Sequence, residues 1–506
     1  MVRYRTMDYK RLVSQLENKN RQGKGLEVRR SLKKLSLKSI PHEHRLPLAN
    51  LARRNNLPDL TVRILKPLVR PAAGLKSSAN PNELAEYAVG LSYLGVTKEA
   101  ENILSTIRPE DVPQVLLFQS FMHFSRWEYA QAAPLLRTYC QFPKLEDYQR
   151  LVGRVNLAAA LINSSATGEA ESLLADLLRE TEERKLSLLH GNCLELNAQL
   201  MLEQKKFAEA LNLLKRSESN LSQGGNLSQF YVFKLQMLLP VLQGDSSAPA
   251  LRNLRRLREE ALRVHHWETL RECDLHEAGI TQDSDLAAHL YFGTPYRSYR
   301  ERILSATEGF FVPPHDYVFT RDQGADPLIV FDLMGAQIEG KKAQLPKGKN
   351  LHRGIYFLSR DQYRPIRLGG LFSSLFPQDY FDPVTSPDRI YQLIKRLRAW
   401  LKKAHLDLTI EETDGAYSLV IGEGLGLRIG EELSSEYNKE LMQLMHVREQ
   451  LGKSDFTAKQ ACKALGFSRT SFNAFINSCM DQNLVLRAGS GRNTSYKIVE
   501  PHAQAG

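Results

Sequence analysis

The segment PDRIYQLIKRLRAWLKKAHLDLTIEETDGAYSLVI, residues 387–421, decides how the C-terminal half of this 506-residue chain folds. Its apolar residues recur at intervals of four, three and four, which places them on one face of a helix. These apolar residues are Ile390, Ile394, Leu397 and Leu401. The opposite face is cationic and carries Lys395, Arg396, Arg398, Lys402 and Lys403. Two β-like runs follow, separated by Asp414-Gly415, a pair typical of hairpin turns. A basic amphipathic helix followed by a hairpin is the layout of a winged helix.

The same segment resembles the OmpR/PhoB-type winged helix. The matching positions are Ile394, Arg396, Leu397, Arg398 and Leu401 in the helix, and Ile410, Thr413, Gly415, Tyr417 and Leu419 in the hairpin. The resemblance extends upstream, because 328–340 resembles the small N-terminal sheet of that family and 347–361 and 365–376 resemble its first two helices. It implies a DNA-binding domain over residues 326–430, with the five cations of the basic helix toward DNA.

One position departs from the family pattern. Asp414 stands where the hairpin usually carries a basic residue, and a carboxylate repels phosphate. The alternative interpretation is an amphipathic surface helix with a solvated basic face, followed by an ordinary hairpin.

Residues 431–506 predict a second winged helix. After a helix over 433–451, Thr457 is placed to cap a short helix, Gly466 to turn the chain and Ser468 to cap the next helix. The outward face of that last helix carries short polar side chains suited to base edges. The tip between two further β-like runs carries Arg492, a cation able to reach phosphate or the minor groove. The predicted DNA-binding residues of this region are Ser468, Arg469, Thr470, Asn473, Asn477 and Arg492.

This second region resembles the winged-helix superfamily of bacterial regulators in a general way. The resemblance implies duplex DNA as a partner. Such a domain can also serve protein contacts or dimerisation, so a homodimer is kept as one possible arrangement.

The N-terminal half predicts a helical repeat array over residues 46–290. An alanine followed four residues later by leucine recurs at spacings of 32, 38, 40 and 40 residues, in the pairs Ala100/Leu104, Ala132/Leu136, Ala170/Leu174, Ala210/Leu214 and Ala250/Leu254. Alanine suits a position where two helix backbones approach closely, and a period of this length indicates stacked helix pairs. The segments 85–104 and 195–214 resemble the tetratricopeptide repeat (TPR), and 47–65 resembles a degenerate copy. The resemblance implies an α-solenoid that binds a protein or peptide partner.

Positive charge is concentrated at the N-terminus. The net charge of the chain is +11, but residues 1–76 hold 19 Lys+Arg against 5 Asp+Glu. The predicted helical segment 1–45 therefore favours polyanions such as nucleic acid, anionic lipid or an acidic protein. A solvated helical face is the alternative.

Several function classes have no support in the sequence. The five cysteines are scattered without a CxxC pair, and the His42/His44 and His265/His266 pairs lack a third ligand nearby, so we expect no metal site and no cofactor. No nucleophile–base constellation and no phosphate-binding glycine motif is present, which indicates that the protein is not an enzyme. No apolar run spans a bilayer, and we expect a cytoplasmic protein without a membrane partner.

Residues 291–325 predict an aromatic, proline-rich connector, whose Tyr291, Tyr296 and Tyr299 either stack on bases or pack inside the protein.

The expected fold is mainly α: an N-terminal TPR-like α-solenoid followed by two small α+β winged-helix domains. The expected function is a bacterial-type transcriptional regulator in which the array binds a protein partner and the winged helices contact double-stranded DNA. The competing interpretations are a scaffold whose modules all bind proteins, or an RNA-associated adaptor.

Overall fold

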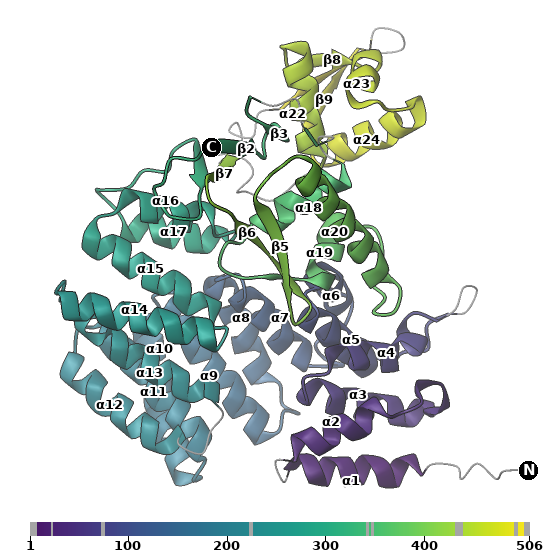
Figure 1. The fold of residues 1–506 in the computed structure, drawn as a ribbon. Helices are drawn as coiled ribbons and strands as arrows, with labels where there is room; N and C mark the ends of the chain where they lie inside the picture. Colours follow the sequence, from purple (N-terminus) through teal and green to yellow (C-terminus); the bar gives the residue numbers. More distant parts are fainter. Residues whose placement is uncertain are drawn as a thin grey trace, which may run out of the picture.

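The computed structural model describes residues 8–21, 24–71, 76–221, 226–340, 344–345, 349–430, 439–489 and 494–499. The protein is mainly helical, and within these residues all strands lie between 316 and 498. Successive helices curve into an arc, and a sheet-containing unit lies between the two ends of that arc (Figure 1). A smaller C-terminal unit lies beyond it.

The helices of the first 306 residues alternate with short connections. They are α1 (Tyr9–Arg21), α2 (Gly25–Lys33), the 3-10 helix η1 (Leu37–Ser39), α3 (His42–Arg54), α4 (Pro58–Val69), α5 (Pro81–Tyr93), α6 (Thr97–Ser105), α7 (Gln114–Phe124), α8 (Tyr129–Gln141), α9 (Asp147–Asn163), α10 (Thr167–Glu183), α11 (Ser187–Glu203), α12 (Phe207–Leu221), α13 (Asn226–Leu242), α14 (Ala248–Arg263), α15 (Trp267–Thr281), α16 (Ser284–Phe292) and α17 (Arg297–Ala306). We refer to α3–α17 as the helical array.

Helices α5 to α14 form five successive pairs, and the alanine–leucine signature lies in the second helix of every pair. All ten of these side chains are at most 1% exposed. Alanine allows the two backbones of a pair to approach, and leucine fills the space one turn later. The predicted period and its buried positions are confirmed.

The turn inside each pair repeats one backbone feature. A single residue adopts a left-handed conformation at Gly95 (φ 88°), Trp127 (φ 64°), Ser165 (φ 61°), Lys205 (φ 59°) and Gly244 (φ 87°). A non-glycine residue in this conformation costs roughly 1–2 kcal/mol, so helix packing must hold these turns in place. Asn56 (φ 56°) makes the same turn between α3 and α4, within residues 47–65.

The basic N-terminal segment packs against the array. Val28 and Leu32 of α2 are fully buried, as is Leu48 of α3, and Asn55 donates a hydrogen bond of 3.0 Å to Asn20 of α1. Helices α1 and α2 therefore extend the arc at its N-terminal end.

The middle unit contains two sheets and three helices. Its elements are β1 (Asp316–Phe319), β2 (Ile329–Asp332), β3 (Gln337–Ile338), α18 (Asn350–Ser359), β4 (Ile366–Arg367), α19 (Leu368–Leu375), α20 (Ser386–Lys403), β5 (Leu408–Thr413), β6 (Ala416–Ile421) and β7 (Leu425–Gly430). One sheet has the order β1-β7-β2-β3 and the other β4-β6-β5. Because β1 pairs with β7 in antiparallel register, the predicted boundary at residue 326 divides a sheet and is wrong there. The predicted connector supplies β1 and helix α17.

The middle unit contacts the N-terminal part of the array through a close backbone approach. A Cβ atom at Gly369 would overlap the carbonyl oxygen of Leu94 in the α5–α6 turn. Asp382 forms an ion pair with Lys66 of α4, and the backbone N–H of Phe381 donates to Glu99 of α6 at 3.0 Å. Burial raises the pKa of Glu99, although that N–H and Arg70 lower it.

The middle unit also contacts the C-terminal part of the array. Arg271 of α15 donates to Asp361 at 2.5 Å, and the hydroxyl of Tyr363 donates to Asp274 at 2.7 Å. One continuous hydrophobic core includes residues of α3–α7, α14–α17 and the middle unit. The unit predicted to be a separate DNA-binding domain therefore shares its core with both ends of the array.

The C-terminal unit has a core of its own. It comprises α22 (Lys439–Leu451), β8 (Asp455–Thr457), α23 (Ala458–Leu465), α24 (Arg469–Asp481), β9 (Val485–Ala488) and β10 (Ser495–Ile498), with the sheet order β8-β10-β9. The predicted helices and the last two strands are present, whereas strand β8 was not predicted. The start of the helix predicted over 433–451 lies outside the described residues.

Ala210 tests the packing of the helix pairs. We expect Ala210→Trp to lower the free energy of unfolding by roughly 1–3 kcal/mol or more, because an indole cannot fit between two touching helices. Ala208→Trp is the matched control, since Ala208 is exposed on the same helix. Thermal unfolding of both full-length variants checks the prediction, and equal melting temperatures for the two would contradict it.

Candidate nucleic-acid interface

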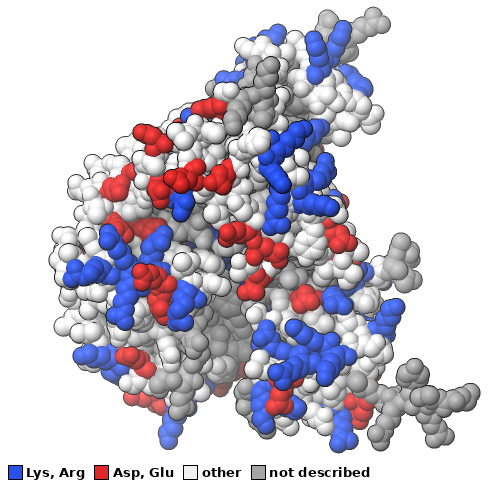
Figure 2. All heavy atoms as spheres, in the orientation of Figure 1, with Lys and Arg blue, Asp and Glu red and all other residues white. Residues whose placement is uncertain are grey.

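Helix α20 turns its apolar stripe inward and its cations outward, as the sequence predicts. Ile390, Ile394, Leu397 and Leu401 are at most 2% exposed, whereas Lys395, Arg396, Arg398, Lys402 and Lys403 are all exposed. Proline and Asp388 occupy its first turn, where a carboxylate suits the positive end of the helix dipole. Figure 2 shows Lys and Arg gathered over this part of the middle unit.

Four of these cations have no carboxylate partner within the described part of the chain. They are Lys395, Arg396, Lys402 and Lys403. Many other cations of the protein are paired, for example Arg389 with Asp379 at 2.6 Å at the start of the same helix. An exposed, unpaired group of cations on one helix provides a local positive field for an anionic partner.

Arg398 differs from the other four. Its guanidinium donates a hydrogen bond of 2.7 Å to the carbonyl oxygen of Ile410. Strand β5, which contains Ile410, is an edge strand, and Arg398 satisfies one of its carbonyl groups. Arg398 was predicted to contact DNA, but its position also gives it a structural role between α20 and the hairpin.

The β5–β6 hairpin carries more negative charge than Asp414 alone. Its turn has positive φ at Asp414 (51°) and Gly415 (73°), as expected for a two-residue hairpin turn. Glu411 and Glu412 are exposed beside Asp414, and Figure 2 shows acidic side chains gathered below the cations of α20. The two glutamates stand two and three residues before Asp414 in the sequence, where the sequence alone could have revealed them. A hairpin with three exposed carboxylates is unsuited to phosphate.

The predicted helix–turn–helix of the C-terminal unit has its expected local structure. Thr457 accepts a hydrogen bond from the Gln460 backbone N–H, and Gln460 in turn caps the Thr457 backbone. Gly466 ends α23 in a left-handed conformation (φ 64°). The hydroxyl oxygen of Ser468 accepts from the Ser471 backbone N–H at 3.1 Å, so Ser468, predicted to contact DNA, has a capping role.

Helix α24 presents the predicted polar face. Phe472, Phe475, Ile476 and Cys479 are buried, and Arg469, Thr470, Asn473 and Asn477 are exposed. The guanidinium of Arg469 lies 5.7 Å from the centroid of the Phe472 ring. Neither asparagine side chain forms a hydrogen bond within the described residues, which leaves their amides available to a partner. Arg492 lies outside the described residues.

The N-terminal helices add a second basic surface. Lys10, Arg11, Lys24, Arg30, Lys33, Lys34 and Lys38 are exposed, and within the residues described none of the seven forms an ion pair. Lys19 is paired with Glu27 at 2.9 Å. This surface is charged but carries no arrangement of donors and acceptors that distinguishes one base from another.

The histidines singled out in the sequence have structural partners, and two of the three tyrosines are buried. His42 contacts Glu83 at 2.9 Å, His265 stacks on Trp267 with ring centroids 5.2 Å apart, and His266 contacts Thr269 at 2.8 Å. Tyr291 and Tyr299 are 8% and 0% exposed, so packing inside the protein rather than stacking on bases explains these two side chains.

Over the described ranges no three His, Cys, Asp or Glu side chains group as a metal site, and no helix there is long and apolar enough to cross a membrane.

A substitution at Arg398 tests whether its hydrogen bond to Ile410 stabilises the fold. We expect Arg398→Ala to lower the free energy of unfolding by roughly 1–2 kcal/mol, because it removes a charge-assisted hydrogen bond. Lys402→Ala is the control on the same helix and should change stability by less than about 0.5 kcal/mol. Urea denaturation measures both. Equal stability of the two variants would show that the contact with Ile410 contributes nothing.

A comparison with models of known protein families finds no match to this chain. A comparison with curated proteins finds no significant match either. The exposed side chains of α20 and α24 are therefore the features from which a function is inferred.

Proposed function

We propose that this protein is a non-enzymatic, DNA-binding transcriptional regulator whose helical array is a TPR-like α-solenoid. In this proposal the middle unit is an OmpR/PhoB-like winged helix and the C-terminal unit is a second winged helix. The order of elements supports it, since α18-α19-α20 precede the β5–β6 hairpin and α22-α23-α24 precede β9 and β10. In winged helices the last helix before the hairpin enters the groove.

The observation that carries the proposal is the set of unpaired cations on α20. Lys395, Arg396, Lys402 and Lys403 are exposed on the helix that follows α19, and their apolar neighbours hold that helix against the core. Cations that neutralise phosphates release counterions, and this release supplies most of the affinity of sequence-independent DNA binding.

The two helices are suited to different parts of the duplex. The cations of α20 suit phosphates, which position a protein without reading sequence. The amides of Asn473 and Asn477 suit base edges, because asparagine can form two hydrogen bonds with adenine in the major groove. We therefore assign affinity mainly to α20 and discrimination mainly to α24.

The array supplies the protein-binding part of the proposed function. Five pairs with one buried signature give the regular stacking that a solenoid needs. Solenoids present an extended surface to a protein or peptide partner, and regulation by such a partner is the role we assign to the array.

One observation favours a second candidate function. The hairpin next to α20 carries Glu411, Glu412 and Asp414, all exposed. This acidic hairpin suits a basic protein surface better than a DNA backbone. A scaffold in which the middle unit binds protein is therefore the alternative.

The cations of α20 are tested together. We expect the full-length variant Lys395→Gln/Arg396→Gln/Lys402→Gln/Lys403→Gln to bind mixed genomic duplex fragments at least about tenfold more weakly at low salt, because four phosphate contacts are lost. The slope of log affinity against log salt should flatten by about 3–4. Electrophoretic mobility shifts over a salt series measure both quantities.

The matched control removes four exposed charges from the array. Lys205→Gln/Lys206→Gln/Lys215→Gln/Arg216→Gln has the same net charge as the α20 variant, and none of these four residues is in an ion pair within the described residues. An equal effect of both variants would indicate a non-specific charge effect. No binding by the unaltered chain would favour the scaffold.

Asn473 tests the assignment of sequence discrimination. On a duplex selected for tight binding, Asn473→Ala should cost roughly 1–3 kcal/mol, with little effect on scrambled DNA, because base contacts specify and phosphate contacts do not. Asn163→Ala, an exposed asparagine of α9, is the control. Equal losses on both duplexes would show that α24 does not read the sequence.

A further inference from the structure

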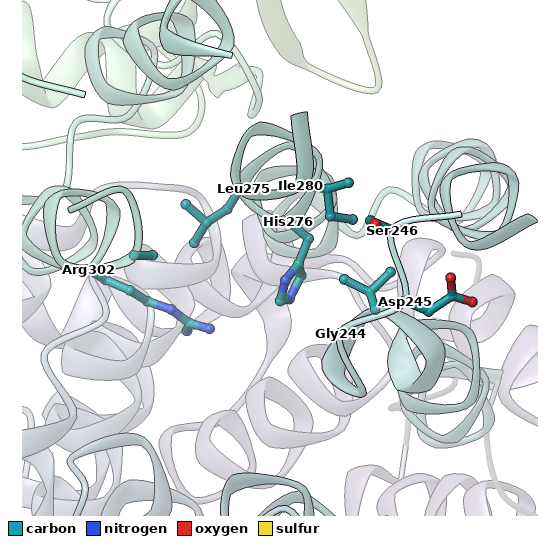
Figure 3. Close-up of a pocket in the computed structure, with 10 residues that line it drawn as sticks. Gly244, Asp245, Ser246, Leu275, His276, Ile280 and Arg302 are labelled. Carbon is teal, nitrogen blue, oxygen red and sulfur yellow. The ribbon is translucent and has the colours of Figure 1, made fainter. Parts of the chain in front are cut away.

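A cavity of about 440 Å³ opens between α15, α17 and the turn that joins α13 to α14. Its walls are mostly apolar and include Val241, Leu275, Ile280 and Ala306. Two polar side chains, Arg302 and His276, point into the same space from α17 and α15 (Figure 3). A mostly apolar cavity with a few convergent polar groups is the usual form of a small-molecule site.

Both polar groups have unfilled hydrogen-bond donors. Within the described part of the chain, neither the guanidinium of Arg302 nor the imidazole of His276 forms a hydrogen bond. The nearest carboxylate to Arg302 is that of Glu272, at 4.0 Å, which is too long for a hydrogen bond. Arginine carries five N–H donors in a fixed plane, so several remain available to a ligand.

Glu272 has a closer cationic partner than Arg302. Lys234 of α13 contacts its carboxylate at 2.6 Å. Although burial raises the pKa of Glu272, the charges of Lys234 and Arg302 and the hydrogen bond from Lys234 lower it to about 2. Glu272 is therefore an anion that pairs with Lys234 at 2.6 Å and more distantly with Arg302 at 4.0 Å, which leaves the N–H donors of Arg302 without a hydrogen bond to it.

His276 adds a donor without adding a charge. Burial lowers the pKa of His276, against the attraction of Glu272 and together with the repulsion of Arg302 and Lys234. A neutral imidazole still offers one N–H. The polar end of the cavity thus combines the guanidinium of Arg302 with hydrogen-bond donors on two helices.

Aromatic side chains hold Arg302 in position. Its guanidinium carbon lies 5.3 Å from the centroid of Trp127 and 6.0 Å from that of Tyr299. Tyr299 is fully buried, so this support is fixed. A guanidinium held by aromatic rings loses little further freedom when it binds an anion.

We propose that this cavity binds a small organic carboxylate with an apolar body, its carboxylate on Arg302 and His276 and its body along Leu275 and Ile280. A single negative charge suits the one guanidinium that faces this space, whereas a phosphate dianion would be repelled more strongly by the carboxylate of Glu272, 4.0 Å from the same guanidinium. A zwitterion is disfavoured, because the carboxylate of Asp245 points away from the space that Arg302 and His276 share (Figure 3). The inference goes beyond the proposed DNA binding and does not depend on it.

Isothermal titration of the full-length protein tests the site with two matched pairs of probes. Benzoate and hexanoate carry the carboxylate, and benzamide and hexanamide have nearly the same shape without the charge. We expect each carboxylate to bind at one site and each amide to bind at least about tenfold more weakly, because a charge-assisted hydrogen bond is lost. These titrations contain no DNA, so their outcome is separate from that of the DNA-binding proposal.

Two variants locate the binding. Arg302→Gln should weaken binding of the carboxylates by about tenfold or more, whereas Arg297→Gln, on the same helix and 93% exposed, should leave it unchanged. Ala306→Trp should block the cavity from an exposed position while both donors remain, so it tests the site even where Arg302→Gln lowers stability. The proposal is overturned if no carboxylate binds at millimolar concentration, if amides bind as tightly, or if Ala306→Trp has no effect.

Discussion

The buried guanidinium of Arg271 is the interaction on which the arrangement of the whole molecule depends. Arg271 is 0% exposed, and a buried charge is tolerated only when it is paired. Its partners come from both sides of an interface: Glu268 on its own helix at 3.0 Å and Asp361 of the middle unit at 2.5 Å. Burial lowers the pKa of Arg271, but the attraction of these two carboxylates raises it by more. The pKa of Arg271 therefore lies above the ordinary value for arginine. Separating the middle unit from α15 would take Asp361 away from Arg271 and leave a buried cation with only one of its two partners. The need to pair Arg271 therefore fixes the orientation of the middle unit.

That orientation is constrained a second time at the other end of the array. Gly369 touches the α5–α6 turn so closely that a side chain cannot be accommodated, and Asp382 is paired with Lys66. The middle unit therefore joins two parts of the array that are almost two hundred residues apart in the chain. Helix α20 is not carried on a freely moving domain, because its unit is held at both ends. A change in the curvature of the array must either move α20 or break one of these contacts.

The sequence predicts the features that arise from local periodicity. The alanine–leucine signature, the inward stripe of α20 and the caps at Thr457 and Ser468 depend on neighbours a few residues away, and the structure has them as predicted. The features that were not predicted depend on residues distant in the chain. Strand β1 pairs with β7 more than a hundred residues later. In the sequence Arg271 has the pattern of a surface residue on an amphipathic helix, and only the fold places Asp361 next to it. Arg302 and His276 likewise become a candidate site only where α15 and α17 meet.

The proposed ligand site and the middle unit are connected by an unbroken series of contacts. Arg302 lies over Trp127, the indole N–H of Trp127 donates to Glu268 at 2.7 Å, and Glu268 pairs with Arg271, which in turn holds Asp361. Physical continuity alone is not coupling, because a ligand shifts an equilibrium only by its differential affinity for the two states. The turn at Trp127 supplies a reason for such a difference, since this residue holds a left-handed conformation (φ 64°) that a bulky side chain adopts at a cost. Its contacts with Arg302 and Glu268 stabilise that conformation. An anion that binds Arg302 where it lies over Trp127 would favour the state in which this turn and its hydrogen bond to Glu268 are formed, and Glu268 is one of the two carboxylates that pair with Arg271.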